Sequence, residues 1–221
     1  MLVGGDGIKK LRIGIGGVLM MLAMLISDAW AVLLTYVAAA LLHELGHIAA
    51  ARSMKIRIDE VRLEFSGVRI VTDSRLISFG KEIALAAAGP TVNALSVVAV
   101  AAYCRVYMID TVELLSATES FLETGEGTIL GVLGFFAVSS LMHAVINLLP
   151  VKSFDGGRIL CGLLSLKVSP NVAERCVEAT TYLSSLLLWT VALYLMLRIA
   201  SGVGVFVFAA CVFAFCTKRG D

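Results

Sequence analysis

The chain has 221 residues, of which 59% are hydrophobic and 16% are charged, and its formal net charge is +1. Soluble domains carry about 45–50% apolar and about 25% charged residues, so this composition excludes an ordinary soluble protein and indicates an integral membrane protein that contacts the lipid bilayer. So small a net charge gives no indication of a nucleic-acid partner, and none is expected.

Apolar stretches predict the fold class, which is an all-α polytopic membrane protein with a single transmembrane domain over residues 1–221. A helix that crosses a bilayer needs about 20 predominantly apolar residues. Residues 158–179 have a mixed composition and are expected to be helical near the membrane surface. We expect six spans, at about 11–27, 29–51, 82–103, 128–149, 180–197 and 202–216.

The segment between the second and third spans differs in kind. Residues 56–72 partly alternate apolar and charged side chains, and Ser66-Gly67 interrupts the alternation. Alternation with a period of two is typical of a strand with one buried face. The pattern therefore predicts a small β-hairpin at the membrane surface.

The distribution of basic residues predicts the orientation in the membrane. With six spans and both termini on the same side, the segments on the opposite side hold only Arg105 and Arg198 of the 18 Lys and Arg residues. Because cytoplasmic loops carry the excess of Lys and Arg, both termini are expected in the cytoplasm. The membrane is expected to be a bacterial inner (plasma) membrane.

The second span contains His43-Glu44-Leu45-Gly46-His47, a motif of the form H-E-x-x-H that holds two of the three histidines. On an α-helix, residues i and i+4 lie about 40° apart around the axis and about 6 Å apart along it. Two imidazoles in this arrangement can bind one metal ion, and the adjacent Glu44 can reach a water on that metal. The motif predicts a metallohydrolase site close to the cytoplasmic end of this span.

A catalytic zinc ion has three protein ligands and one position for water, so the chain must supply a third ligand. Asp155 is the best candidate, because it follows the fourth span in a turn framed by Pro150 and by glycines. A turn aspartate that only caps the next helix is the alternative. His143, inside the fourth span, is a rival ligand. Asn93, inside the third span, either holds helices together or belongs to the active site.

Three motifs together resemble the site-2 protease family of intramembrane zinc metalloproteases (M50-type). They cover about residues 29–160, and the likeness is closest to the bacterial branch that processes a sporulation pro-sigma factor. The motifs are His43-Glu44-x-x-His47, Ala88-Gly89-Pro90-x-x-Asn93, and Asn147-Leu148-x-Pro150 leading into Asp155-Gly156.

The resemblance implies a zinc metalloendopeptidase with one Zn²⁺ ion per chain. It implies that His43, His47 and Asp155 bind the metal, that Glu44 activates the water, and that Asn147 and Pro150 present the substrate. Asn93 is grouped with these last two as a candidate substrate-binding residue.

The implied function is hydrolysis of membrane-associated or transmembrane protein substrates near the cytoplasmic face. Release of a transcription factor or sigma factor would be one outcome, with inhibitory or regulatory membrane proteins as further partners. The segment between spans two and three is too short for a PDZ domain, and no CBS domain is expected after the sixth span. Two alternatives stay open, a catalytically silent zinc-binding scaffold and a metal-binding transporter.

Overall fold

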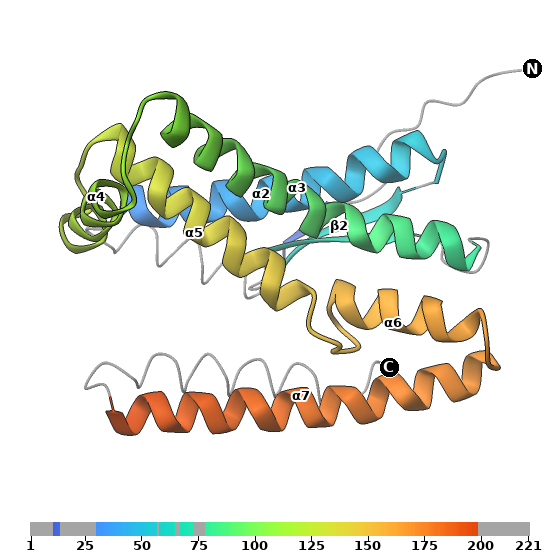
Figure 1. Ribbon diagram of the computed structural model, residues 1–221. Helices are drawn as coiled ribbons and strands as arrows, with labels where there is room; N and C mark the ends of the chain where they lie inside the picture. The colour runs from blue at the N-terminus through green and yellow to red at the C-terminus, as the bar shows by residue number, and fades with distance from the viewer. Residues whose placement is uncertain (1–10, 14–29, 57, 65–66, 73–77, 199–221) are drawn as a thin grey trace, which may run out of the picture. The chain divides into compact units, whose positions relative to one another are not determined.

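The computed structural model describes residues 11–13, 30–56, 58–64, 67–72 and 78–198. The described residues fall into two compact units, of which the first ends at Val145 and the second begins at Ile146. The described part of the chain is mainly helical (Figure 1). The expected span at 202–216 lies outside the described residues.

Three helices of the described part are long and apolar enough to cross a membrane. They are α2 (Trp30–Ser53), α3 (Phe79–Val106) and α5 (Ile129–Asn147), and they correspond to the spans expected at 29–51, 82–103 and 128–149. By length and composition, these three helices are the candidate membrane spans of the described part of the chain.

The outer surface of α2 explains why this helix has no polar face. Its large apolar side chains Trp30, Leu34, Leu41 and Leu45 are exposed, while the two motif histidines are buried. In water such a helix would expose an unfavourable apolar surface, whereas in a bilayer the same side chains contact lipid. The two imidazoles of the motif are therefore directed into the protein and not toward lipid.

Glycines allow α2 and α3 to approach each other closely. A Cβ atom added to Gly46 would lie 2.8 Å from the carbonyl oxygen of Ala88 and 2.9 Å from Cγ2 of Val92. Real Cβ atoms essentially never come this close to a neighbour, so Gly46 is required by the contact. Small residues play this part at helix contacts within membranes. The close approach sets the side chains of α3 against the motif on α2.

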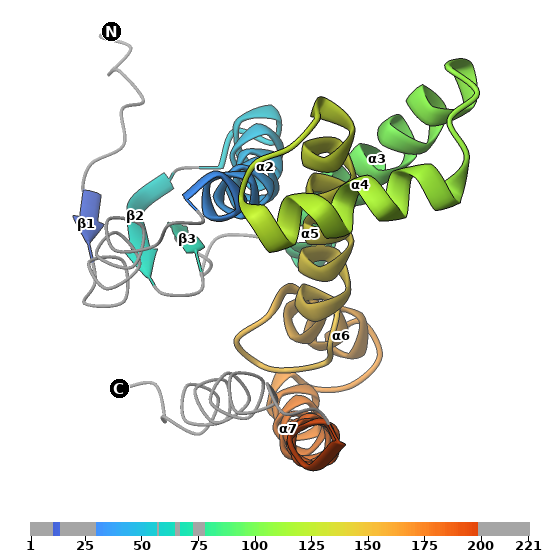
Figure 2. The ribbon, with the colours of Figure 1, turned by 90° about the vertical axis from the view of Figure 1, so that its left-hand side faces the viewer.

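A three-stranded sheet also belongs to the first unit, with the order β1-β2-β3. Strands β2 (Ile58–Glu64) and β3 (Gly67–Thr72) pair antiparallel with a register shift near Ile58, and β1 (Leu11–Ile13) pairs parallel with β2. Figure 2 shows β3 as the strand nearest to α2, which it contacts. β3 pairs with β2 on one side and is an edge of this sheet.

β1 corrects the first expected span. Leu11, Arg12 and Ile13 pair with Val61, Arg62 and Leu63 of β2, so the span expected at 11–27 is wrong at its first three residues. A hydropathy pattern gives no weight to backbone pairing with a strand almost 50 residues away. The remainder of that span lies outside the described residues.

The acidic segment between spans three and four contains a helix, α4 (Thr111–Thr124), that the sequence analysis did not predict. The side chain of Asp110 accepts a hydrogen bond from the backbone N–H of Glu113 at 2.7 Å, which caps the first turn. Gly125 ends the helix with a φ of 68°, a conformation that glycine adopts at little cost. The ring of Phe121 lies 6.0 Å from that of Phe135 on α5.

The second unit contains α6 (Asp155–Ser165) and α7 (Pro170–Arg198). The stretch 158–179, expected to be helical, is divided between these two helices. The span expected at 180–197 lies within α7. Proline is favoured in the first turn of a helix because its missing N–H would have no intrahelical partner there, and α7 begins at Pro170.

Candidate metal centre

The two motif histidines converge on one point inside the first unit. His43 and His47 are 3% and 7% exposed, and their Nε2 atoms are 3.2 Å apart. Two nitrogens that each lie about 2.0–2.1 Å from a tetrahedral zinc ion stand about 3.3 Å apart. The spacing of one helical turn thus gives the separation that two ligands of one ion require.

The imidazole of His47 is oriented by the backbone of α3. Its Nδ1 lies 2.8 Å from the carbonyl oxygen of Leu85, and since a carbonyl can only accept, Nδ1 carries the proton and donates. The lone pair of His47 is then on Nε2, the nitrogen that faces His43. Metal-binding histidines commonly donate their second ring N–H in this way.

The imidazole of His43 has a different neighbour on α3. The amide nitrogen of Asn93 lies 3.4 Å from Nδ1 of His43. Asn93 is fully buried, and within the described part of the chain its Oδ1 has no hydrogen-bond partner. The residue grouped with the substrate-binding candidates is therefore placed beside a histidine of the motif.

Gly89 keeps the space beside both imidazoles open. A Cβ atom at this position would lie 2.6 Å from Nε2 of His43 and would also collide with Nε2 of His47. Any residue other than glycine would occupy the place where the two nitrogens meet. The open cradle, together with the 3.2 Å separation and the buried imidazoles, fits a metal ion of the size and ligand preference of zinc.

Glu44 is half-buried and directly follows His43 on α2. Consecutive helical residues are rotated by about 100° around the axis, so Glu44 leaves the helix on a different side from the two imidazoles. This placement suits a carboxylate that acts on a water next to the ion and is not one of the ligands.

His143, the rival ligand, is hydrogen-bonded within its own helix and packs against an aromatic ring of α2. Its Nδ1 donates to the carbonyl oxygen of Ser139 at 3.0 Å, and its ring centroid is 4.8 Å from that of Tyr36 and 6.4 Å from that of His43. Among the described residues, no group of possible metal donors includes His143. His143 lies on α5, and its ring packs against Tyr36 of α2.

In the second unit, Asp155 is the first residue of α6 and is buried. Its Oδ1 lies 3.9 Å from the guanidinium Nη1 of Arg158. The turn that precedes it packs tightly, because a Cβ on Gly156 would collide with the carbonyl group of Leu148 and one on Gly157 with that of Val151. These glycines let the first turn of α6 pack against the backbone of the preceding turn.

Asn147 and Pro150, the other two substrate-binding candidates, flank the end of α5. Asn147 is the last residue of the helix, and both side chains are half-buried. The carbonyl oxygen of Pro150 accepts a hydrogen bond from the hydroxyl of Thr180 on α7 at 2.9 Å.

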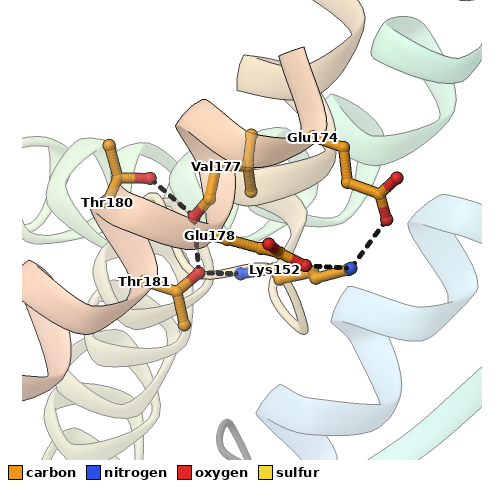
Figure 3. A network of polar contacts seen from close by, with 6 residues as sticks. All are labelled: Lys152, Glu174, Val177, Glu178, Thr180 and Thr181. Atoms are coloured by element: carbon orange, nitrogen blue, oxygen red, sulfur yellow. Dashed lines mark hydrogen bonds and ion pairs between the residues drawn. The ribbon is translucent and has the colours of Figure 1, made fainter. Parts of the chain in front are cut away.

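Hydrogen bonds and ion pairs connect the loop between α5 and α6 to α7 (Figure 3). The backbone N–H of Lys152 donates to Oγ1 of Thr181 at 2.9 Å, and its ammonium group lies 2.7 Å from Glu174 and 3.1 Å from Glu178. The hydrogen bond to Glu174 raises the pKa of Lys152 above its ordinary value, and Glu178 acts in the same direction. Since this ammonium group is half exposed, water screens the ion pairs, and the part-buried hydrogen bond to Thr181 restrains the loop more.

Two contributors to the centre were missed by the sequence analysis. The carbonyl of Leu85 has no signature in a sequence, because every residue has a backbone carbonyl. The space-keeping role of Gly89 was also missed, although the small residues Ala88-Gly89 mark a place where another helix can approach closely.

Comparisons with known proteins give a family for the chain and a similar fold. The model of the family described as Peptidase family M50 matches residues 29–191 of the chain. The fold is similar to that of the site-2 protease from Methanocaldococcus jannaschii, with a TM-score of 0.58, 21% sequence identity, and coverage of 96% of this chain and 93% of that chain. The comparison with curated proteins gives no match.

Proposed function

This chain belongs to Peptidase family M50 and is an intramembrane zinc metalloprotease, and we propose that it cleaves transmembrane or membrane-associated proteins near the cytoplasmic face. The observation that carries the proposal is the buried pair His43 and His47, whose Nε2 atoms lie 3.2 Å apart on a candidate membrane span. Members of the family act on membrane proteins, so the substrate is a membrane protein as well.

One zinc ion per chain is proposed, with His43, His47 and Asp155 as its ligands. These three side chains offer the donor set that could hold a metal ion, two imidazoles and one carboxylate. Imidazole and carboxylate are common ligands of catalytic zinc, and three protein ligands leave one position for water.

Glu44 is the proposed general base and then general acid. When bound, zinc supplies a water of lowered pKa and polarises the peptide carbonyl. Glu44 accepts the proton of the attacking water as the new carbon–oxygen bond forms. It then gives that proton to the nitrogen of the leaving amine as the carbon–nitrogen bond breaks.

The substrate is proposed to bind as an extended strand, because the carbonyls of a helix are hydrogen-bonded and shielded. β3 offers an edge for such a strand and contacts α2, the helix that carries the motif. Pairing with an edge strand is a common way to bind an extended peptide. Asn147 and Pro150, at the end of α5, are proposed to contact the same strand.

Several broader features are also proposed. The chain is proposed to form a single protease domain with six spans in a bacterial inner membrane. Both termini are proposed to lie in the cytoplasm, an orientation that the distribution of Lys and Arg supports. The extended third motif, from Asn147 to Asp155, supports the branch that processes a sporulation pro-sigma factor. Regulation by inhibitory membrane proteins fits that placement.

Metal removal tests the function directly. The purified protein, reconstituted with a membrane-tethered substrate, is expected to cut it within or next to the transmembrane segment. A chelator is expected to abolish this cut, and stoichiometric zinc to restore it. Mass spectrometry of the products locates the cut. Cleavage that continues at full rate after complete removal of metal would refute the metalloprotease assignment.

The third ligand is tested by metal analysis of two variants. Asp155→Ala is expected to lose most of its zinc, because a site with two protein ligands is incomplete. His143→Ala is expected to retain one zinc per chain, since His143 donates to Ser139 on its own helix. The opposite result, with zinc lost only from His143→Ala, would transfer the ligand role to His143.

A further inference from the structure

We infer that Asn93 is a positioning residue whose side-chain amide can hydrogen-bond to Nδ1 of His43 in either tautomer of that histidine. The amide thereby allows Nε2 of His43 to bind the metal. This inference rests on the proposed function, because it concerns the same ion. It concerns a contact between α2 and α3 alone, and both helices belong to the first unit.

The tautomer of His47 follows from its contact with α3. Nδ1 of His47 donates to the carbonyl of Leu85, so Nε2 of His47 carries the lone pair and can only accept. Nε2 of His43 lies 3.2 Å away. A hydrogen bond at this distance requires that Nε2 of His43 carry the proton, and Nδ1 of His43 then has the lone pair.

The orientation of Asn93 agrees with that tautomer. Its amide nitrogen, a donor, faces Nδ1 of His43 at 3.4 Å. A continuous chain of donors therefore runs from Asn93 through His43 and His47 to the carbonyl of Leu85. In this arrangement each ring N–H of the two histidines has an acceptor.

Metal binding demands the other tautomer of His43. A nitrogen that binds zinc cannot carry a proton, so the proton of the neutral ring must be on Nδ1, where it needs an acceptor. Rotation of the Asn93 amide by 180° presents Oδ1 to that proton. In the described structure Oδ1 is a fully buried atom that has no hydrogen-bond partner, so the rotation breaks no described bond of this oxygen.

The side-chain amide of Asn93 meets both requirements. Asparagine offers both a donor and an acceptor at the same reach. An aspartate carboxylate can accept only, and so favours the metal-binding tautomer. Leucine has a similar size and offers neither function. Comparing aspartate and leucine at position 93 therefore distinguishes a hydrogen-bonding role of Asn93 from a role in packing alone.

Zinc affinity of Asn93 variants tests the inference without measuring proteolysis. Asn93→Leu is expected to weaken zinc binding by about 10–100-fold, the usual effect of losing a partner of a metal-binding histidine. Asn93→Asp is expected to bind zinc at least as tightly as the wild type. Thr91→Val, which removes an exposed hydroxyl two residues away on α3, is the matched control and is expected to bind zinc normally.

Nitrogen NMR of the wild-type protein keeps the inference testable if a variant fails to fold. Because the chain has three histidines, their ¹⁵N signals can be assigned by substitution. The proton of His43 is expected on Nε2 before zinc addition and on Nδ1 after it. A proton on Nδ1 in both conditions, or normal zinc affinity in folded Asn93→Leu, would overturn the inference.

These outcomes are distinct from failure of the proposed function. A protein whose zinc affinity depends on Asn93 but which never cleaves a substrate would refute the function and leave the positioning role intact. A protein that cleaves its substrate, with zinc affinity independent of residue 93, would refute the positioning role alone.

Discussion

Glu44→Gln is expected to lower cleavage of a membrane-tethered substrate by about 10²–10⁴-fold, the range that a positioned general base contributes. Glutamine has nearly the same shape as glutamate but cannot accept the proton of the attacking water. Zinc content is expected to remain at one ion per chain, because the proposed ligands are His43, His47 and Asp155. Product formation and bound metal should be measured on the same preparation.

The matched control is Glu119→Gln, which removes an exposed carboxylate on α4. It is expected to cleave at the wild-type rate. The comparison also separates the protease from a zinc-binding scaffold, because a scaffold would be indifferent to the loss of Glu44. Equal cleavage by the wild type and by Glu44→Gln would mean that Glu44 is not the base and would contradict the proposed mechanism.

Gly89→Ala is expected to reduce cleavage by at least about 100-fold, the cost that a displacement of about 1 Å can have in an active site. The added Cβ would lie 2.6 Å from Nε2 of His43 and closer still to Nε2 of His47. The helices cannot simply separate, because they are also in close contact at Gly46. The imidazoles must therefore move, and zinc affinity is expected to fall together with activity.

Gly80→Ala provides the control on the same helix. A Cβ at Gly80 would have nothing within 4 Å, so this substitution tests the general effect of replacing a glycine of α3 by alanine. Activity and zinc affinity are expected to match those of the wild type. Zinc affinity should be measured by titration and helix content by circular dichroism. Normal zinc binding by Gly89→Ala would show that the cradle is not needed.

Features that depend only on residues close together in the sequence could be predicted from it. The spacing of His43 and His47 predicted two imidazoles at one point, because the geometry of one helical turn is the same in every α-helix. The apolar stretches identified the membrane-crossing lengths of α2, α3 and α5, since hydropathy depends on composition alone. The cap of α4 was also local, with Asp110 placed three residues before Glu113, and a closer reading of helix starts would have predicted that helix.

Contacts between distant segments were decided only by the tertiary structure. Asn93 meets His43 across 50 residues, and Leu85 meets His47 across 38. β1 pairs with a strand that lies far along the chain. No pattern within α2 or α3 specifies which residues of the other helix it will contact, because that register depends on where Gly46 and Gly89 let the two backbones approach. The sequence by itself determined that two histidines of a candidate membrane helix lie one turn apart on the same face. The packing of α3 against that helix determined how their ring nitrogens are oriented.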